Sequence, residues 1–223
     1  KEFQKYNKNC KILAFDHTVN NKFWVDRFLK DFVSLLLFKK IKPYQILDVF
    51  KFVQYFSFFK GKNKHFLKKI VSTKKNQSNQ ITISEAIGDN KDIVLKVDIE
   101  GDEYKVLKEI NKNFDKLNLV IIEFHNLHKN LKKIKDFINK TKLKNIHINA
   151  NNYEKVDRNG IPKVIEMTLI NPKKFKSIKN KTIPNPLRPR FRNKDQANIY
   201  FLSQRKFQSE KKILFKQKFR MII

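Results

Sequence analysis

The sequence predicts an α/β fold in which a mostly parallel sheet is flanked by helices. Short apolar runs rich in β-branched residues alternate with longer stretches whose apolar residues recur every three or four positions. This alternation is typical of parallel strands joined by crossover helices, which cover both faces of the sheet. With 40% apolar residues among 223, including 21 Phe, the chain can fill the core of one domain.

The N-terminal part is expected to contain one strand and two helices. An unbroken apolar run that ends in Asp16 predicts a short buried strand over 11–16. Helices are expected over 21–40 and from Pro43 onward, since proline suits the first turn of a helix. We interpret both helices as core-facing. The alternative is attachment to a membrane surface or a partner protein, which would leave a large exposed apolar patch.

The next segment contains one further strand and the start of a short helix. Residues 66–71 are expected to form the strand, and the polar residues 72–80 a loop. A helix is expected to start within 81–87, with Thr82 or Ser84 as its N-cap.

The clearest pattern lies in the second half of the chain. Strands are expected at 93–99, 119–124, 143–148 and 164–170, and helices at 102–113 and 126–141. In the last of these helices the residues expected to face inward are Leu127, Leu131, Ile134, Phe137 and Ile138. Beyond residue 171 the regularity fades among prolines, and 204–223 is expected to form a basic helix or no ordered structure.

Polar residues follow the ends of four expected strands. In open α/β sheets ligands bind outside the carboxyl ends of the strands, so these residues are candidates for a shared crevice. They are Asp16 with His17, Asp98 with Glu100, Glu123 with His125, and Asn149 with Asn151 and Asn152.

These candidates differ in how easily they are explained without a function. Asp102 and Glu103 are interpreted as helix-start carboxylates that favour the helix dipole. Asp98 lies within an apolar strand, where an ionised carboxylate is costly without partners, and this favours a functional role. No His or Cys cluster has the spacing of zinc ligands, so no metal site is expected.

Several of these segments together resemble FkbM-type methyltransferases. The run at 95–104 (Leu-Lys-Val-Asp-Ile-Glu-Gly-Asp-Glu-Tyr) is similar to the family signature, roughly Leu-Lys-hydrophobic-Asp-hydrophobic-Glu-Gly-x-Glu. The family follows it with a helix and a strand ending in Glu-x-His, as at 123–125. The strand ending at Asp16, the segment 81–85 and the strand at 164–170 resemble further parts of the domain.

The resemblance implies a Rossmann-like class I methyltransferase fold that uses S-adenosyl-L-methionine. It also implies methylation of a hydroxyl group on a sugar or related metabolite, so the expected partner is a small-molecule or saccharide acceptor. The cofactor-binding candidates are Asp16 (ribose), His17, Glu85 (near the adenine) and Asp98 (beside the methyl donor). The substrate-binding candidates are Glu100, Glu123, Asn149 and Asn151. His125 is the first candidate for the general base, with Asp98 second.

The chain departs from this family at its front. Such folds begin with a central strand and a glycine-rich loop, but none of the four glycines precedes Asp16. We therefore expect a partial methyltransferase domain at 1–171, truncated at the N-terminus, with a helical insertion at about 19–60. The chain is then either a fragment of a longer protein, which we favour, or a degenerate member of the family. A basic extended tail is expected at 172–223, and cofactor binding is expected to be weak or absent.

The charge allows an alternative function, a basic module that binds RNA or another polyanion without catalysis. The net charge is +29, but 43 of the 50 basic residues are Lys, which suits codon bias better than base or phosphate recognition by Arg. A nucleic-acid partner is therefore not favoured. One Cys, no secretory signal and no apolar run of about 18 residues predict a cytoplasmic protein without a transmembrane segment. The sequence defines no oligomeric state.

Overall fold

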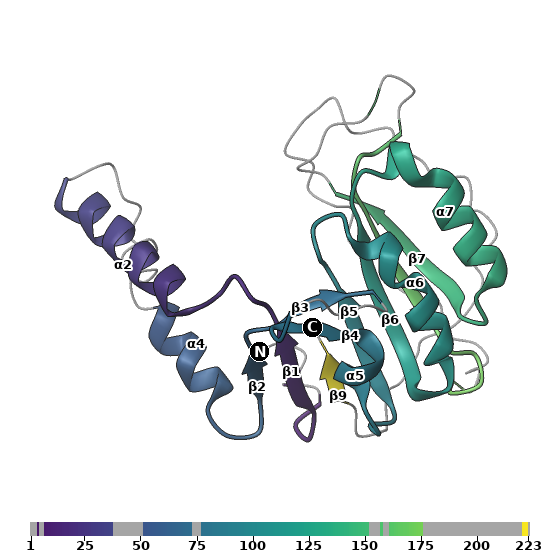
Figure 1. Ribbon diagram of the computed structural model, residues 1–223, viewed down its shortest axis with the longest axis horizontal. Coiled ribbons are helices and arrows are strands. Elements are labelled where there is room, and N and C mark those ends of the chain that lie inside the picture. The colour runs from purple at the N-terminus through teal and green to yellow at the C-terminus, as the bar shows by residue number, and fades with distance from the viewer. Residues whose placement is uncertain are drawn as a thin grey trace, which may run out of the picture.

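The computed structural model describes residue 4 and residues 7–37, 51–72, 77–151, 157, 161–175 and 220–222. Within these residues, one sheet has seven strands in the order β2-β1-β9-β5-β6-β8-β7, and a second sheet pairs β3 with β4 (Figure 1). The strands are β1 Lys11–Phe15, β2 Lys64–Phe66, β3 Lys69–Val71, β4 Gln80–Thr82, β5 Ile93–Val97, β6 Leu117–Phe124, β7 Lys144–Ala150, β8 Ile165–Ile170 and β9 Arg220–Ile222. The helices are α2 Asn21–Leu36, α4 Lys51–Phe59, α5 Ile83–Ile87, α6 Glu103–Lys112, η2 Phe114–Lys116 and α7 Leu127–Lys140.

The main sheet is parallel over its first five strands and antiparallel at one end. Strands β2, β1, β9, β5 and β6 pair in parallel, whereas β8 pairs antiparallel with both β6 and β7. The expected α/β architecture with a mostly parallel sheet is thus confirmed. Because β1, β9, β5 and β6 run in one direction, the residues that follow β1, β5 and β6 share one edge of the sheet.

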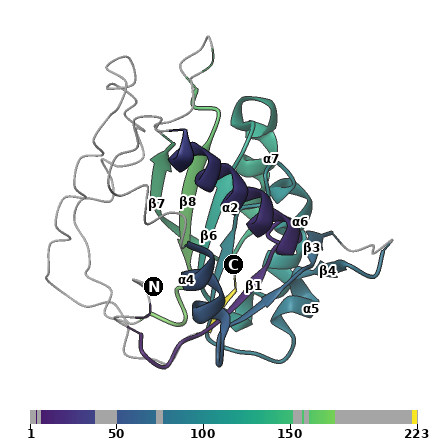
Figure 2. The ribbon, with the colours of Figure 1, turned by 90° about the vertical axis from the view of Figure 1, so that its left-hand side faces the viewer.

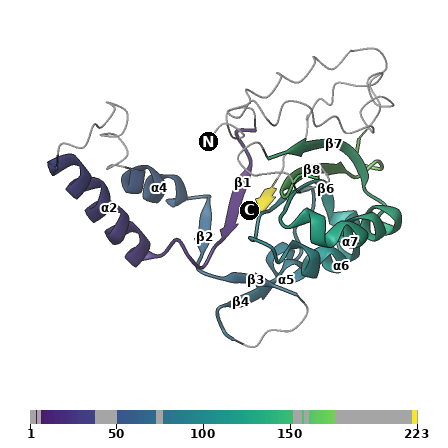
Figure 3. The ribbon, with the colours of Figure 1, turned by 90° about the horizontal axis from the view of Figure 1, so that it is seen from above.

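The helices α5, α6 and α7 all lie on one face of the main sheet (Figure 3). The larger apolar core forms between them and the sheet, because alternate strand residues such as Leu95, Val97 and Ile122 point to that face. A smaller cluster around Val94 and Leu119 occupies the other face, where Phe58 and Phe59 of α4 and Phe175 pack. The expectation of helices on both faces is therefore wrong for most of the described part of the chain.

Strand β9 occupies the centre of the sheet, between β1 and β5. Residues 220–222 pair with residues 11–13 on one side and with 93–95 on the other, in parallel on both. This is the place in which the resemblance puts the first strand of the domain. The expected basic helix or absence of order over 204–223 is wrong for these three residues, while 204–219 lie outside the described residues.

Helices α2 and α4 form an arm that extends away from the rest of the molecule (Figures 1 and 3) and lies in front of the main sheet in Figure 2. Neither helix has a buried residue among those whose side chains are described. The prediction that both face the core is therefore wrong, and only Phe58 and Phe59 at the end of α4 reach the smaller cluster. The expected helix start at Pro43 lies outside the described residues.

Three local expectations are also changed by the structure. The strand expected over 66–71 is split into β2 and β3, which belong to different sheets. Thr82, rather than Ser84, is the N-cap of α5, and its side chain and that of Glu85 form a reciprocal capping box. On α7, Leu131 and Ile138 are exposed instead of facing inward.

Among the described helices, none is long and apolar enough to cross a membrane.

Candidate functional site

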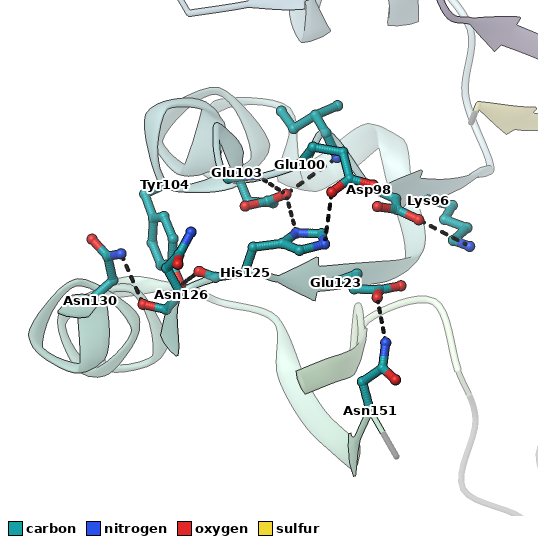
Figure 4. Close-up of polar contacts among 12 residues, drawn as sticks. Lys96, Asp98, Glu100, Glu103, Tyr104, Glu123, His125, Asn126, Asn130 and Asn151 are labelled. Atoms are coloured by element: carbon teal, nitrogen blue, oxygen red, sulfur yellow. Dashed lines mark hydrogen bonds and ion pairs between the residues drawn. The ribbon is translucent and has the colours of Figure 1, made fainter. Parts of the chain in front are cut away.

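A histidine and three carboxylates meet where β5 and β6 end (Figure 4). His125 directly follows β6, and Asp98, Glu100 and Glu103 lie between the end of β5 and the first turn of α6. Parallel pairing of β5 with β6 sets the two strand ends side by side, which brings these groups together. The sequence-based expectation that Asp98, Glu100 and His125 share a crevice edge agrees with this arrangement.

Glu103 is the structural centre of the cluster. Its side chain is fully buried, and its Oε1 atom accepts hydrogen bonds from three donors. These are the backbone N–H groups of Ile99 (3.3 Å) and Gly101 (2.9 Å) and the Nδ1 atom of His125 (2.9 Å). Glu103 therefore fixes the turn after β5 and the orientation of the imidazole at the same time.

The turn between β5 and α6 has a backbone that suits this arrangement. Gly101 has φ +105°, a conformation that L side chains rarely adopt, and Glu100 has φ +52°. Asp102 occupies the N-cap position of α6, but its side chain makes no cap hydrogen bond and pairs with Lys105 at 2.6 Å. The helix-dipole interpretation therefore describes Asp102 better than Glu103, whose role is to bind His125.

The opposite side of the imidazole faces two exposed carboxylates. The Nε2 atom of His125 lies 3.4 Å from Oε2 of Glu100, whose side chain is 86% exposed. Asp98 is also exposed and forms an ion pair with Lys96 at 3.8 Å. Since β5 ends at Val97, the expectation of an Asp98 carboxylate buried within the strand is wrong.

Asp98, Glu100 and His125 are the described residues best placed to share a cation. One potential ligand atom of each lies within 4.8 Å of those of the other two. Exposed acidic groups often gather without a metal, and the hydrogen bond from His125 to Glu103 already accounts for the imidazole orientation.

Glu123 and Asn151 form a second polar pair beside this cluster. Asn151 donates from Nδ2 to Oε1 of Glu123 at 3.1 Å, and its backbone N–H donates to the carbonyl of Val164. Asn149 is exposed on β7. Asn152 lies outside the described residues. Glu123 and Asn151 were both expected to follow strand ends at one edge of the sheet, and the structure brings them into direct contact.

Asp16 follows β1 at the same edge of the sheet. Strand β1 lies two strand spacings, about 10 Å, from β5. The Oδ1 atom of Asp16 accepts hydrogen bonds from the backbone N–H and hydroxyl of Thr18, at 2.7 and 2.6 Å. Burial raises the pKa of the Asp16 carboxyl, but these bonds and the nearby His65 lower it by more, so its pKa lies below the ordinary value. The neighbouring His17 is exposed.

Glu85 has a structural role in the capping box of α5. Its Oε2 atom accepts from the backbone N–H and the hydroxyl of Thr82, at 2.9 and 3.1 Å. The position near an adenine that was expected for Glu85 stays a prediction, and the observed contacts of its side chain are those of the capping box.

The electrostatics of His125 favour its protonated form. Burial lowers the pKa of the imidazole, but the hydrogen bond to Glu103 and the charges of Glu103, Glu100 and Asp98 raise it by more. The pKa of His125 therefore lies above its ordinary value of 6.5. Burial, with the charge of Glu103, also raises the pKa of Tyr104 to about 12, and its hydroxyl donates to the backbone carbonyl of His125 at 2.6 Å.

This raised pKa predicts a pH-dependent stability. Above pH 6.5 the unfolded chain releases the His125 proton while the folded chain keeps it. The stabilisation is complete below pH 6.5 and is lost as the pH rises through the folded-state pKa. We expect His125→Asn to flatten the decline of the free energy of unfolding above pH 6.5, measured by urea denaturation at several pH values. An unchanged decline in this variant, equal to that of the exposed-site control His17→Asn, would contradict the prediction.

The family of the chain follows from a comparison with family models. The model of the methyltransferase FkbM domain matches residues 12–157, which is more than half of the chain. The chain belongs to the FkbM methyltransferase family. A search of curated proteins and a search of solved structures gave no match.

The matched region of this FkbM domain contains Asp16, Asp98 and the cluster around His125. The resemblance inferred from the signature at 95–104 is thus confirmed. Glu103 was missed as a site residue, although it ends the Gly-x-Glu part of that signature. Its place two residues after Gly101 in that signature was the available signal.

Proposed function

We propose that this FkbM family member is an S-adenosyl-L-methionine-dependent methyltransferase of Rossmann-like class I fold, which acts on a hydroxyl group of a sugar or related small metabolite. The observation that carries the proposal is the imidazole of His125. It is oriented by a buried carboxylate at the carboxyl edge of parallel strands and presents Nε2 to solvent-exposed acids. A cytoplasmic location is part of the proposal, supported by a single, buried cysteine, Cys10.

His125 is the proposed general base. S-adenosyl-L-methionine would supply an electrophilic methyl group when bound. Nε2 of His125 would accept the proton of the acceptor hydroxyl, while Glu103 holds Nδ1 and stabilises the resulting imidazolium. Because the pKa of His125 is raised, the fraction of the neutral base grows as the pH rises, and the rate is expected to increase through that pKa.

The polar groups around His125, two exposed carboxylates and one half-buried pair, suit a hydroxylated acceptor. Asp98 and Glu100 offer carboxylate oxygens, and the pair of Glu123 with Asn151 offers both an acceptor and a donor. Hydrogen bonds to neighbouring hydroxyl groups would align the reacting oxygen with the methyl group, and alignment supplies much of the catalysis in two-substrate reactions. The same carboxylates would repel a phosphate backbone, so this edge favours a small acceptor over nucleic acid.

Asp16 is the proposed ribose ligand. Its lowered pKa keeps the carboxyl ionised at neutral pH, and an ionised carboxylate accepts hydrogen bonds from two adjacent hydroxyl groups. Its position after β1 leaves room of about two strand spacings before Asp98. The hydrogen-bond acceptors at this edge, Asp16 and Asp98, therefore suit a ligand that extends from a ribose to a reactive sulfonium.

Binding of S-adenosylhomocysteine tests this assignment. Saturation-transfer NMR detects weak binding, which is the regime expected for this chain. We expect a transfer signal at millimolar ligand that S-adenosyl-L-methionine reduces by competition. Asp16→Asn should weaken the binding about tenfold, since a charged hydrogen bond contributes roughly 1.5 kcal/mol.

The matched control is Asp115→Asn, which makes the same substitution at an 86% exposed side chain away from the edge. It should leave the transfer signal unchanged. An equal loss of the signal in both variants would overturn the assignment of Asp16 to the ribose.

A further inference from the structure

Helix α2 carries a continuous stripe of exposed apolar side chains. Its members recur at intervals of three and four residues along one helix face, and each is at least 39% exposed. They are Val25, Phe28, Leu29, Phe32, Val33 and Leu36. Leu37 beyond the helix and Val53 and Phe56 on α4 are also at least half exposed, and we call these residues together with the stripe the arm surface.

Among the described residues, the contacts within the arm cover this surface only at one edge, where Phe28 and Phe56 take part in ring contacts between and within the two helices. One edge of α2 packs on α4, with Trp24 4.8 Å from Tyr55 and Phe28 6.0 Å from Phe52 between ring centroids. The base of the arm is held by a hydrogen bond between Tyr55 and His65 of β2. Figures 1 and 3 show α2 as the helix farthest from the main sheet. The exposed fractions of the stripe residues show that they are not buried against the body of the protein.

We expect the arm surface to be covered by a binding partner, because monomeric proteins in solution rarely expose large contiguous apolar patches. The charge of the arm indicates what kind of partner this is. The sequence from 21 to 60 contains eight Lys and Arg and three Asp, and the whole chain has a net charge of +29. A second copy of the chain would bring the same positive charge to the contact, whereas an anionic surface would attract it.

The charged residues of α2 further favour an arm that lies along a lipid surface. Five of its 16 residues are charged, and Arg27 and Asp31 form an ion pair at 3.5 Å on the side away from the stripe. A helix with one apolar face and one charged face binds in the plane of the membrane interface, with the apolar face among the upper acyl chains. Aromatic residues, abundant in α2 and α4, favour this interface.

We propose that the α2–α4 arm attaches the protein to the surface of an anionic lipid bilayer through the arm surface. The lysines and arginines around it contact lipid headgroups, and the stripe is inserted below them. This inference is independent of the methyltransferase proposal, since it concerns residues outside the His125 cluster and its test requires no cofactor or acceptor.

Trp24 makes the test direct, because it is the only tryptophan of the chain and lies on α2. Vesicles of phosphatidylcholine alone and with phosphatidylserine are mixed with the full chain. We expect flotation with the anionic vesicles, a blue shift of the Trp24 emission, and quenching of that emission by brominated acyl chains. Flotation without a change in the emission would show attraction by overall charge alone and would overturn the proposal.

The decisive variant is Leu29→Ser with Val33→Ser, which changes two members of the stripe without removing a ring contact with α4. It should lower the partition coefficient onto anionic vesicles about tenfold or more, because two aliphatic side chains no longer enter the apolar layer. The control, Leu131→Ser with Ile138→Ser, alters two exposed apolar residues of α7 and should bind as the unaltered chain does. Circular dichroism checks that both variants fold.

Two other outcomes would reject the lipid as the occupant. Equal vesicle binding by the arm variant and the α7 control would show that the stripe does not insert. A dimer in sedimentation equilibrium that the arm variant abolishes, with no emission change on vesicles, would assign the arm surface to a second copy of the chain.

Discussion

Glu103→Ala is expected to lower the free energy of unfolding by about 3 kcal/mol. The substitution removes the acceptor of the Ile99 and Gly101 N–H groups and of the His125 imidazole at a fully buried position. Each buried donor left without a partner costs about 1–3 kcal/mol, and truncation of one partner of a buried ionic pair costs about 3–5 kcal/mol. Urea denaturation at neutral pH measures the difference from the unaltered chain.

The adjacent Asp102 supplies the matched control. Asp102→Ala removes a carboxyl group at the same helix start, but one that makes no cap hydrogen bond and only pairs with the exposed Lys105. Such surface ion pairs contribute about 0–1 kcal/mol, so this variant should stay close to the unaltered chain. Equal destabilisation by the two alanine variants would mean that Glu103 acts through the helix dipole, as its sequence position alone indicated, and not through its hydrogen bonds.

His125→Asn is expected to lower the rate of methyl transfer about 100- to 10,000-fold, which is the usual contribution of a general base. The measurement is transfer of a labelled methyl group to a hydroxylated acceptor. Binding of S-adenosylhomocysteine should change little, because the base contacts the acceptor hydroxyl. The remaining activity should lose the rise with pH that the raised pKa of His125 predicts.

A histidine outside the cluster separates catalysis from general effects of substitution. His147 lies on β7, the edge strand of the sheet, and His147→Asn should keep the rate and its pH profile. If His125→Asn retains the pH-dependent rise, another group takes the proton, and Asp98 becomes the next residue to substitute. Loss of S-adenosylhomocysteine binding in His125→Asn would instead assign the imidazole to the cofactor.

The central part of the fold was predictable because its residues are buried on both sides of the sheet. The apolar residues of β5 and β6 all pack in one core cluster or the other, so the sequence pattern is strong. The polar residues at those ends, Asp98 and His125, stand out against it. Glu103 did not, since a glutamate at a helix start is common, and its partner His125 lies 22 positions away in the sequence.

Elements whose state depends on distant parts of the chain were predicted less well. The periodicity of α2 is that of a core-facing helix, and nothing local distinguishes a face that packs on a core from one that faces outward. Strand β9 has three residues, too few to show any period, and its pairing depends on β1 and β5. The run at 66–71 looks like one strand because the sequence does not reveal that its two halves join different sheets.

The position of β9 has a consequence for the order in which the molecule is assembled during translation. Within the described residues, β9 alone pairs with both β1 and β5, and so joins β2 and β1 to the rest of the main sheet. Its pairing with β1 connects residues more than 200 positions apart. Contacts of such long range form slowly, and these cannot form before residue 222 has left the ribosome. Until then the nascent chain carries two open strand edges at β1 and β5, which are sites where chaperones or neighbouring chains can pair.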